Sequence, residues 1–371
     1  MKKVLLTVFA LFIMALSTGC WEAVDISNQA FVTTLAIDKG EGNKKFIVST
    51  EIVKPGMLFE KEADGKAYLM ESAEGDSIAE ALEHIQTRIP RLLSLSHLRV
   101  MLVGEALAKD HFFDAIEFIQ KYPEKALRLR LMFIKDTESR AVLAARPAIG
   151  RYIAEDLVLM SRLENKSAMM HTNKLIDFIG DMRSRGGQGM GTMLSLEEEG
   201  QKIIYKGTAV FDKYKLVGWL DGSETKAANW IVGDGYDTVL LNAGHGIYAY
   251  CVEDRNLSIK PVWNEQGALS FTIRLKTDGI LVDEQGYDYD MRRPQHIAQV
   301  EKIFSEEVAA QIRSAVEKSQ KEIGVDYLGL GEYLYRQDPQ KFKALDWEKV
   351  YPDIPVNVEV NCLITRFGLS P

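Results

Sequence analysis

The chain of 371 residues is poor in the side chains that build metal and nucleophile sites. It has three cysteines, Cys20, Cys251 and Cys362, and six histidines. The last two cysteines match no zinc-ligand spacing, no histidine belongs to an HExxH motif, and GxSxG is absent. Zinc hydrolases and serine hydrolases of these types are therefore unsupported. Two buried thiols are the simpler interpretation of Cys251 and Cys362, and a disulfide between them stays open.

The chain also lacks an excess of positive charge. Lysine and arginine number 45 against 53 acidic residues, which gives a net charge of −8. Nucleic-acid binding needs a basic footprint, so this function is disfavoured. Anionic lipid headgroups also repel an acidic body, so charge alone will not hold it at a membrane.

A long apolar stretch is missing after residue 21, where no run approaches the eighteen residues of a membrane-spanning helix. The one apolar segment lies at the start. Lys2 and Lys3 precede residues 4–16, in which only Thr7 is polar. A helix of this length reaches ~20 Å, too short for a hydrocarbon core of ~30 Å. The segment therefore predicts an export signal that is later removed.

Cys20 follows the small residues Ser17, Thr18 and Gly19, which is the pattern of a bacterial lipobox. We expect residues 1–19 to be cleaved and the Cys20 thiol to carry a diacylglyceryl group, with N-acylation of the new terminus left open. An ordinary signal peptide beside a cysteine is the alternative. Ser17 stands where lipoboxes usually have leucine, and Leu16 lies one position further out. Two acyl chains suffice for stable anchoring.

The mature chain of 352 residues loses two basic residues and no acidic ones, leaving a net charge of −10. This length predicts two or three domains. Residues 21–29 span at most ~30 Å even when fully extended. They contain no glycine, proline or low-complexity tract. The folded body should therefore lie close to the bilayer, which suits a partner located in the membrane.

Hydrophobic patterns predict a mixture of strands and helices. Residues 30–38 and 46–53 form an expected hairpin, and residues 127–135 alternate like a half-exposed strand. Helices are expected after Asp76 as N-cap and over residues 105–122, 137–145, 149–163 and 172–183. Strands at 98–104, 202–222, 246–252, 268–282 and 356–368 and a long helix at about 295–323 complete the pattern. The fold class is α+β, multidomain, with mixed or antiparallel sheets flanked by helices.

The glycine-rich segment 183–192 is the predicted domain break. We expect an N-terminal α+β region at 20–190, left open as one or two subdomains, and a C-terminal α+β domain at 191–371. Three motifs raise other possibilities. GGQGMG at 186–191 and GLGEYL at 329–334 lack the ending and strand context of phosphate loops, and YDYD at 287–290 is too short for a calcium loop. Carboxylate pairs for glycoside cleavage stay open, because their separation is set by the fold.

Several segments, taken together and in order, resemble the Ger(x)C family, the lipoprotein C subunits of spore nutrient-germinant receptors. They are GCWEAVDISN at 19–28, LAIDKG at 35–40, SHLRVMLVGEALAKD at 96–110, KGTAVFDKYKLVGWLDGSET at 206–225, and the run from 319 through Trp347 to VNVEVNCLITRFG at 356–368. Glu22 stands where the family often has aspartate. The resemblance covers essentially the whole mature chain.

The resemblance implies an α+β body of about three domains on the outer face of the spore inner membrane. It implies two integral-membrane partners, an A-type and a permease-like B-type subunit, and no catalytic residue, cofactor or metal. Cys20 is the one residue to which it gives a chemical role. His97 and residues 206–210 match the family pattern and are interpreted as structural. Neither the nutrient nor direct binding of it by this subunit follows from the resemblance.

Two other classes compete with a non-enzymatic receptor subunit. A solute-binding lipoprotein of a transporter also has a lipobox, but it commonly has a longer linker and two lobes with parallel sheets. The clustering of strands as hairpins weighs against it. A lipid-anchored hydrolase comes third, because no motif supports it.

Overall fold

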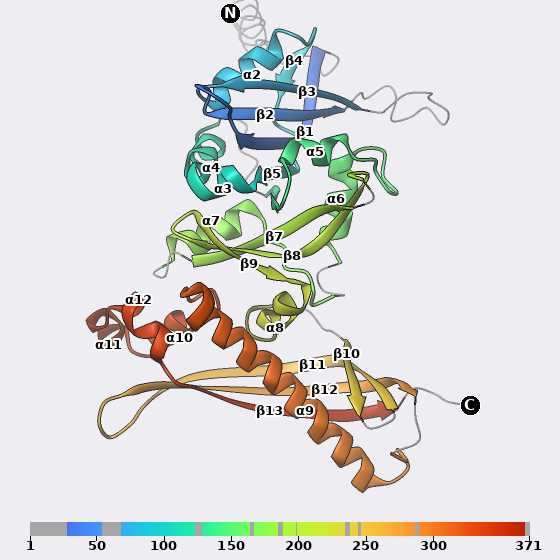
Figure 1. Ribbon diagram of the computed structural model, residues 1–371, viewed down its shortest axis with the longest axis vertical. Helices are drawn as coiled ribbons and strands as arrows, with labels where there is room; N and C mark the ends of the chain where they lie inside the picture. Colours follow the sequence, from blue (N-terminus) through green and yellow to red (C-terminus); the bar gives the residue numbers. More distant parts are fainter. Residues whose placement is uncertain are drawn as a thin grey trace, which may run out of the picture.

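In the computed structural model, the described residues are 28–53, 68–122, 128–163, 167–184, 188–197, 199–233, 238–243, 246–285 and 289–367. They form two β-sheets, one of nine strands and one of four. The nine-stranded N-terminal sheet and the four-stranded C-terminal sheet lie towards opposite ends of the long axis of the molecule (Figure 1).

The N-terminal sheet is mixed and has the strand order β3-β2-β1-β5-β6-β7-β8-β9, with the short strand β4 paired to β1. Its central strands β1, β5, β6 and β7 are parallel, and hairpins form both ends. The strands are β1 (Gln29–Lys39), β2 (Phe46–Val53), β3 (Tyr68–Gly75), β4 (Leu92–Ser94), β5 (Val100–Gly104), β6 (Arg130–Ile134), β7 (Gln188–Glu197), β8 (Lys202–Asp212) and β9 (Lys215–Asp221).

Helices cover both faces of this sheet. One face carries α2 (Ile78–Gln86), α3 (Glu105–Asp110), α4 (Phe112–Lys121) and α7 (Leu175–Arg183), and the other carries α5 (Ser139–Ala144) and α6 (Ile153–Ser161). Four aromatic rings meet at the centre of the first face, at centroid distances of 4.4–6.0 Å: Phe112, Phe133, Phe178 and Phe211. Gly191 on β7 is required there, because a Cβ atom would lie 2.3 Å from the Phe133 ring.

The C-terminal sheet has the order β10-β11-β12-β13, with β13 parallel to β12. Its strands are β10 (Thr238–Ala243), β11 (Gly246–Trp263), β12 (Leu269–Gln285) and β13 (Val356–Phe367). The long helix α9 (Pro294–Glu317), which continues as a π-helix (Lys318–Ile323), packs its apolar side against one face. The short helices α10 (Leu330–Gln337), α11 (Pro339–Ala344) and α12 (Trp347–Val350) and a 3₁₀ turn (Tyr351–Asp353) follow.

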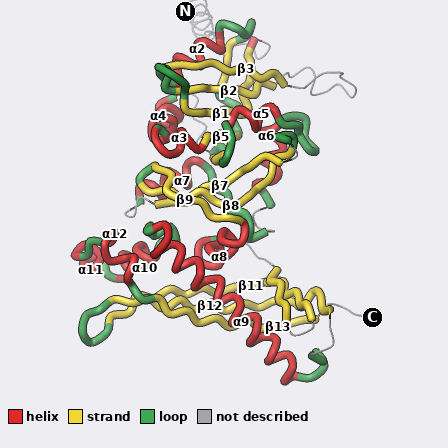
Figure 2. The backbone as a smooth tube through the Cα atoms, in the orientation of Figure 1, coloured by secondary structure: helices red, strands yellow, loops and turns green. Residues whose placement is uncertain are grey.

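Helix α8 (Gly222–Val232) joins the two parts of the molecule. It contacts β8 and β9 of the N-terminal sheet and α9 of the C-terminal region. Figure 2 shows α8 between the two groups of strands. The division between the sheets thus falls between β9 and β10, later than the expected break after residue 190. We propose the segment between Asp221 and Thr238 as the boundary, with α8 as the connecting element.

The predicted α+β class and most of the predicted elements are confirmed. Three of the differences are informative. Ser77 rather than Asp76 caps α2, because the Ser77 hydroxyl accepts the Glu80 amide proton. The alternating segment at 127–135 is a buried central strand, since its arginines precede or begin β6 and residues 131–134 are all buried. Residues 188–192 of the glycine-rich segment belong to β7.

Candidate functional site

A cleft of about 800 Å³ lies between the two parts of the molecule. The N-terminal part contributes the end of α7 and the start of β7, including Asp181, Arg183 and Gln188. The C-terminal part contributes Arg255 of β11 and the segment from Asp326 into α10. A cleft of this size between two domains is a usual place for a small-molecule site.

Helix α8 forms one wall of the cleft and is fixed by both parts. Its start is a capping box, in which the Asp221 side chain accepts the Glu224 amide proton and Glu224 binds the Asp221 amide. Glu224 also pairs with Lys318 of the C-terminal region. Asn229 donates to the carbonyl oxygens of Ala168 and Met170, at 2.7 and 2.8 Å. These contacts tie the helix to residues far apart in the sequence.

The cationic side chains of the cleft are already engaged by the protein. Arg255 donates to the carbonyls of Asn229 and Trp230 at the end of α8, where the helix dipole favours a positive charge. Arg183 binds Gln120 at 2.6 Å, and Arg336 binds Glu332 of the same helix at 3.0 Å. A ligand anion in the cleft would have to compete with these contacts.

Asp326 is fully enclosed at the C-terminal side of the cleft. Its carboxylate accepts the amide protons of Leu330 and Gly331, at 2.9 and 2.7 Å, and the indole N–H of Trp347 at 3.2 Å. Burial raises the pKa of Asp326 to about 6, against the opposing effect of these donors. The carboxylate occupies the position at the N-terminus of α10 that a phosphate would take in a phosphate loop. The GLGEYL segment is therefore built around an internal anion.

Asp181 is the carboxylate of the cleft that faces the solvent without a counter-charge. Among the described residues, no cation or hydrogen-bond donor contacts its side-chain oxygens. Partial desolvation and the neighbouring charge of Asp177 raise the pKa of Asp181 to about 6. Of the groups that line the cleft, Asp181 is thus the one poised to accept a cation or a proton.

Two further buried carboxylates hold helices to the N-terminal sheet. Asp38 of β1 accepts from the Ser139 amide and hydroxyl and from the Arg140 amide, at the start of α5. Glu51 of β2 accepts from the amides of Ile153 and Ala154, at the start of α6, and from two threonine hydroxyls. Burial raises the pKa of both groups, partly offset by these donors. Neither helix has a side-chain cap of its own, so these carboxylates act as caps.

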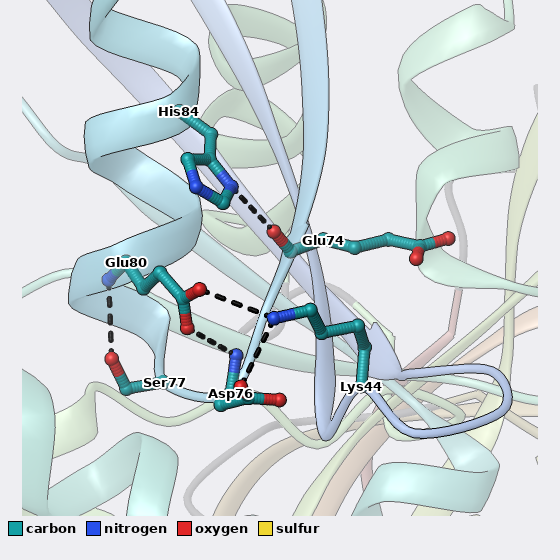
Figure 3. Close-up of polar contacts among 6 residues, drawn as sticks. All are labelled: Lys44, Glu74, Asp76, Ser77, Glu80 and His84. Atoms are coloured by element: carbon teal, nitrogen blue, oxygen red, sulfur yellow. Dashed lines mark hydrogen bonds and ion pairs between the residues drawn. The ribbon is translucent and has the colours of Figure 1, made fainter.

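A polar cluster at the far edge of the same sheet has a comparable structural role (Figure 3). Lys44 pairs with Asp76 and Glu80, at 3.0 and 3.2 Å, which ties the β1–β2 turn to α2. The His84 ring contacts the Glu74 carbonyl at 2.9 Å. That carbonyl lies on β3, the edge strand of the sheet. His84 of α2 therefore gives a hydrogen-bond partner to a backbone group that an uncovered edge strand would leave exposed. The Asp76 amide and Lys44 lower the pKa of Glu80.

The residues singled out in the sequence do not meet in one site. Cys20, the predicted lipidation residue, lies outside the described residues. The His97 ring contacts the Phe31 ring at a centroid distance of 4.4 Å, and residues 206–210 lie inside β8. Cys251 and Cys362 are both free thiols, and Cys362 is buried. Asp290 of the YDYD segment pairs with Arg292 at 2.9 Å and with Arg293 at 3.5 Å.

The cleft and the roles of the buried carboxylates were not predicted from the sequence. A signal was present for Asp38 and Glu51, because each is a charged residue within a segment that the sequence predicts as a strand. Within the described ranges, no cluster of three or more histidine, cysteine or acidic side chains is arranged to hold a metal ion. No helix in these ranges is long and apolar enough to span a bilayer.

Comparisons with known proteins cover almost the whole chain. Residues 22–196 match the family model "Spore germination protein N-terminal domain", and residues 206–368 match "Spore germination B3/GerAC like, C-terminal". Spore germination protein KC of Bacillus subtilis is 23% identical over 99% of this chain and 97% of its own length. Spore germination protein B3 of the same organism is 24% identical, with 96% of each chain covered.

The fold also has a counterpart among solved structures. The crystal structure of the GerBC protein superposes with a TM-score of 0.61, at 18% sequence identity, covering 89% of this chain and 96% of that one. At this identity the likeness concerns the fold alone. Together with the two consecutive family models, it confirms the resemblance noted in the sequence. The chain belongs to the Spore germination B3/GerAC-like, or Ger(x)C, family.

Proposed function

We propose that this chain is a non-enzymatic, lipid-anchored subunit of a receptor that starts spore germination in response to small nutrients. The match of two family models to consecutive parts of the chain carries the proposal. The names of the relatives, spore germination proteins KC and B3, support the same process. We place the protein on the outer face of the spore inner membrane, held there by acyl chains on Cys20.

The proposed partners are two integral-membrane subunits, an A-type subunit and a permease-like B-type subunit. The short segment between Cys20 and β1 supports this arrangement, because it keeps the body within ~30 Å of the bilayer. In this proposal the subunit acts through contacts rather than chemistry. The use of Asp38, Glu51 and Asp326 as helix caps supports such a role, since their oxygens are occupied by protein donors.

A solute-binding lipoprotein is the second candidate, and the cleft is the observation that favours it. Asp181 would then receive the cationic group of a ligand. Asp181→Asn should weaken the binding of a small amine or amino acid by about tenfold, as expected for loss of one charged contact. Isothermal titration of residues 21–371 checks this, with Asp177→Asn as control. Absence of binding by the parent protein argues against this candidate.

Affinity purification from detergent-solubilised spore inner membranes tests the receptor proposal. We expect a tagged chain to recover a permease-like polytopic protein and a second membrane subunit, identified by mass spectrometry. Recovery of the chain alone, or with an ATP-driven transporter, contradicts the proposal.

Cys20→Ala tests the anchor in the same strain. It should abolish lipidation and release the body, and germination through this receptor should fall by about tenfold or more, because the local concentration at the membrane is lost. The strain must lack other nutrient receptors. A folded, unlipidated chain that still supports normal germination would contradict the role of the anchor.

A further inference from the structure

Ile149, in the loop between α5 and α6, is the large apolar side chain with the greatest exposure in the described part of the chain. Its exposed fraction is 92%, against 55% for the next, Leu92. Single exposed apolar residues are common, so the significance of Ile149 depends on how the loop is held and on what surrounds it. The loop connects α5 to α6 beside the N-terminal sheet (Figure 1).

The loop is held in shape by one buried carboxylate. Asp156 of α6, which is 7% exposed, accepts the amide protons of three consecutive residues: Ala148 at 2.5 Å, Ile149 at 3.3 Å and Gly150 at 2.6 Å. Gly150 is needed because a Cβ atom would lie 2.7 Å from the Asp156 carboxylate. The protein therefore fixes a conformation that presents Ile149 to the outside.

The loop lies at the side of the sheet where the chain enters from the predicted anchor. The Tyr68 hydroxyl donates to the Ala145 carbonyl, at 3.5 Å, just before the loop. Tyr68 pairs with Val53, and Val53 pairs with Phe31, the third residue of β1. After the loop, Arg99 donates to the Tyr152 hydroxyl, and the Arg99 amide binds the Thr33 carbonyl. The end of the loop thus lies near Thr33 of β1, and its start lies at the end of β3 that is paired, through β2, with the start of β1.

The surroundings of Ile149 are those of an interfacial contact. Arg146 and Arg151 flank it, both exposed and without an ion-pair partner among the described residues. Leu92 pairs with Gln29, the first residue of β1, and follows the exposed Arg91. Besides the buried Asp156, the acidic neighbours are Glu155, which binds the Arg151 amide, and Glu197 and Glu199 of the β7–β8 turn, which approaches Arg146 through Gln201. An exposed apolar side chain between two arginines suits the membrane interface, because the apolar side chain can enter the acyl region while the arginines reach the lipid headgroups.

We propose that the loop formed by residues 146–151 is a second membrane contact, in which Ile149 enters the headgroup–acyl boundary and Arg146 and Arg151 bind lipid phosphates. The inference rests on the proposed lipid anchor at Cys20. Residues 21–29 span at most ~30 Å, so the bilayer is the surface within reach of this side of the sheet. The acidic body opposes adsorption by itself, and the contact therefore depends on the anchor. Its effect is to fix the orientation of the body on the membrane.

The test uses the lipidated chain in vesicles of phosphatidylethanolamine and phosphatidylglycerol. Ile149→Cys, made in a Cys251→Ser background, carries an environment-sensitive fluorophore, while Cys362 is buried and stays unlabelled. Val262→Cys is the matched control, because Val262 is also an exposed apolar residue, at 45%, and lies on β11 of the C-terminal sheet. We expect a blue-shifted emission at position 149 and quenching by nitroxide lipid about threefold stronger than at position 262.

Equal quenching at the two positions, with both chains floating with the vesicles, overturns the inference and leaves the anchor intact. A blue shift at 149 that requires added receptor subunits and shows no lipid quenching also overturns it, since the occupant is then a protein pocket. If neither chain floats, the anchor fails and the inference fails with it. Unlabelled Ile149→Ser should melt like the parent, because Ile149 buries almost no surface.

Discussion

The two sheets of the molecule bury their strands in different ways. The central strands of the N-terminal sheet are covered on both faces: all five residues of β5 and residues 131–134 of β6 are buried. The C-terminal sheet is covered on one face by α9 and α10, and buried and exposed residues alternate along β12 from Phe271 to Thr277. The difference arises because the parallel strands of the N-terminal sheet lie between two layers of helices, whereas the C-terminal sheet has helices on one face and solvent on the other.

The comparison shows where polar groups are costly. In the buried parts of β1 and β2 a charged residue has no solvent face, so Asp38 and Glu51 are retained only with several donors each. In the C-terminal sheet Glu359 points to solvent from β13 and pairs with Arg274 across the strands, at 2.6 Å. Acidic residues therefore hold helices to the strands in the N-terminal sheet, whereas in the C-terminal sheet Glu359 forms an ion pair at the surface.

The largest expected effect comes from Glu51→Gln. The amide group would place N–H donors against the amides of Ile153 and Ala154 and the threonine hydroxyls, so one or two buried groups lose their partners. We expect the free energy of unfolding to fall by about 2–4 kcal/mol, measured by urea denaturation. Glu359→Gln is the matched control and should leave the unfolding midpoint unchanged. Equal losses in both variants would break the comparison.

The next effect is a pH dependence centred on Asp326. Its pKa is about 6 in the folded protein, above the ordinary value of 3.8, so the folded state binds its proton more tightly than the unfolded state. The Asp326 contribution to the free energy of unfolding therefore falls as the pH rises from about 4 to 6, by about 1–3 kcal/mol. Urea titrations of the parent and Asp326→Asn should differ in slope across this range.

Asp326→Asn also loses donor contacts, so its stability will be lower at every pH. The informative quantity is the slope rather than the level. Parallel slopes for parent and variant between pH 4 and 6 would show that the carboxyl group does not titrate there.

The sequence predicted elements better than it predicted burial or assembly. The hairpin of β1 and β2, the helix after Ser77 and the long helix α9 follow from local periodicity and turn residues, which a sequence displays directly. The strand β6 was misassigned as half-exposed, since its flanking arginines mimic alternation while helices cover both of its faces. The addition of β7, β8 and β9 to the first sheet depends on pairing between segments about sixty residues apart. The cleft is lined by residues from both parts of the molecule, so no single segment of the sequence indicates it.

The smallest effects concern the ion pairs that join the two parts of the molecule. Glu224 and Lys318 are partly buried, with side chains 32% and 18% exposed, whereas Lys213 and Glu348 are both 63% exposed. Double-mutant cycles with Glu224→Gln/Lys318→Met and Glu348→Gln/Lys213→Met measure each pair separately. We expect a coupling of about 1 kcal/mol for the first pair, because screening by water is weaker there, and a smaller one for the second. A stronger exposed pair would mean that surface charges, rather than α8 and its capping residues, hold the two sheets together.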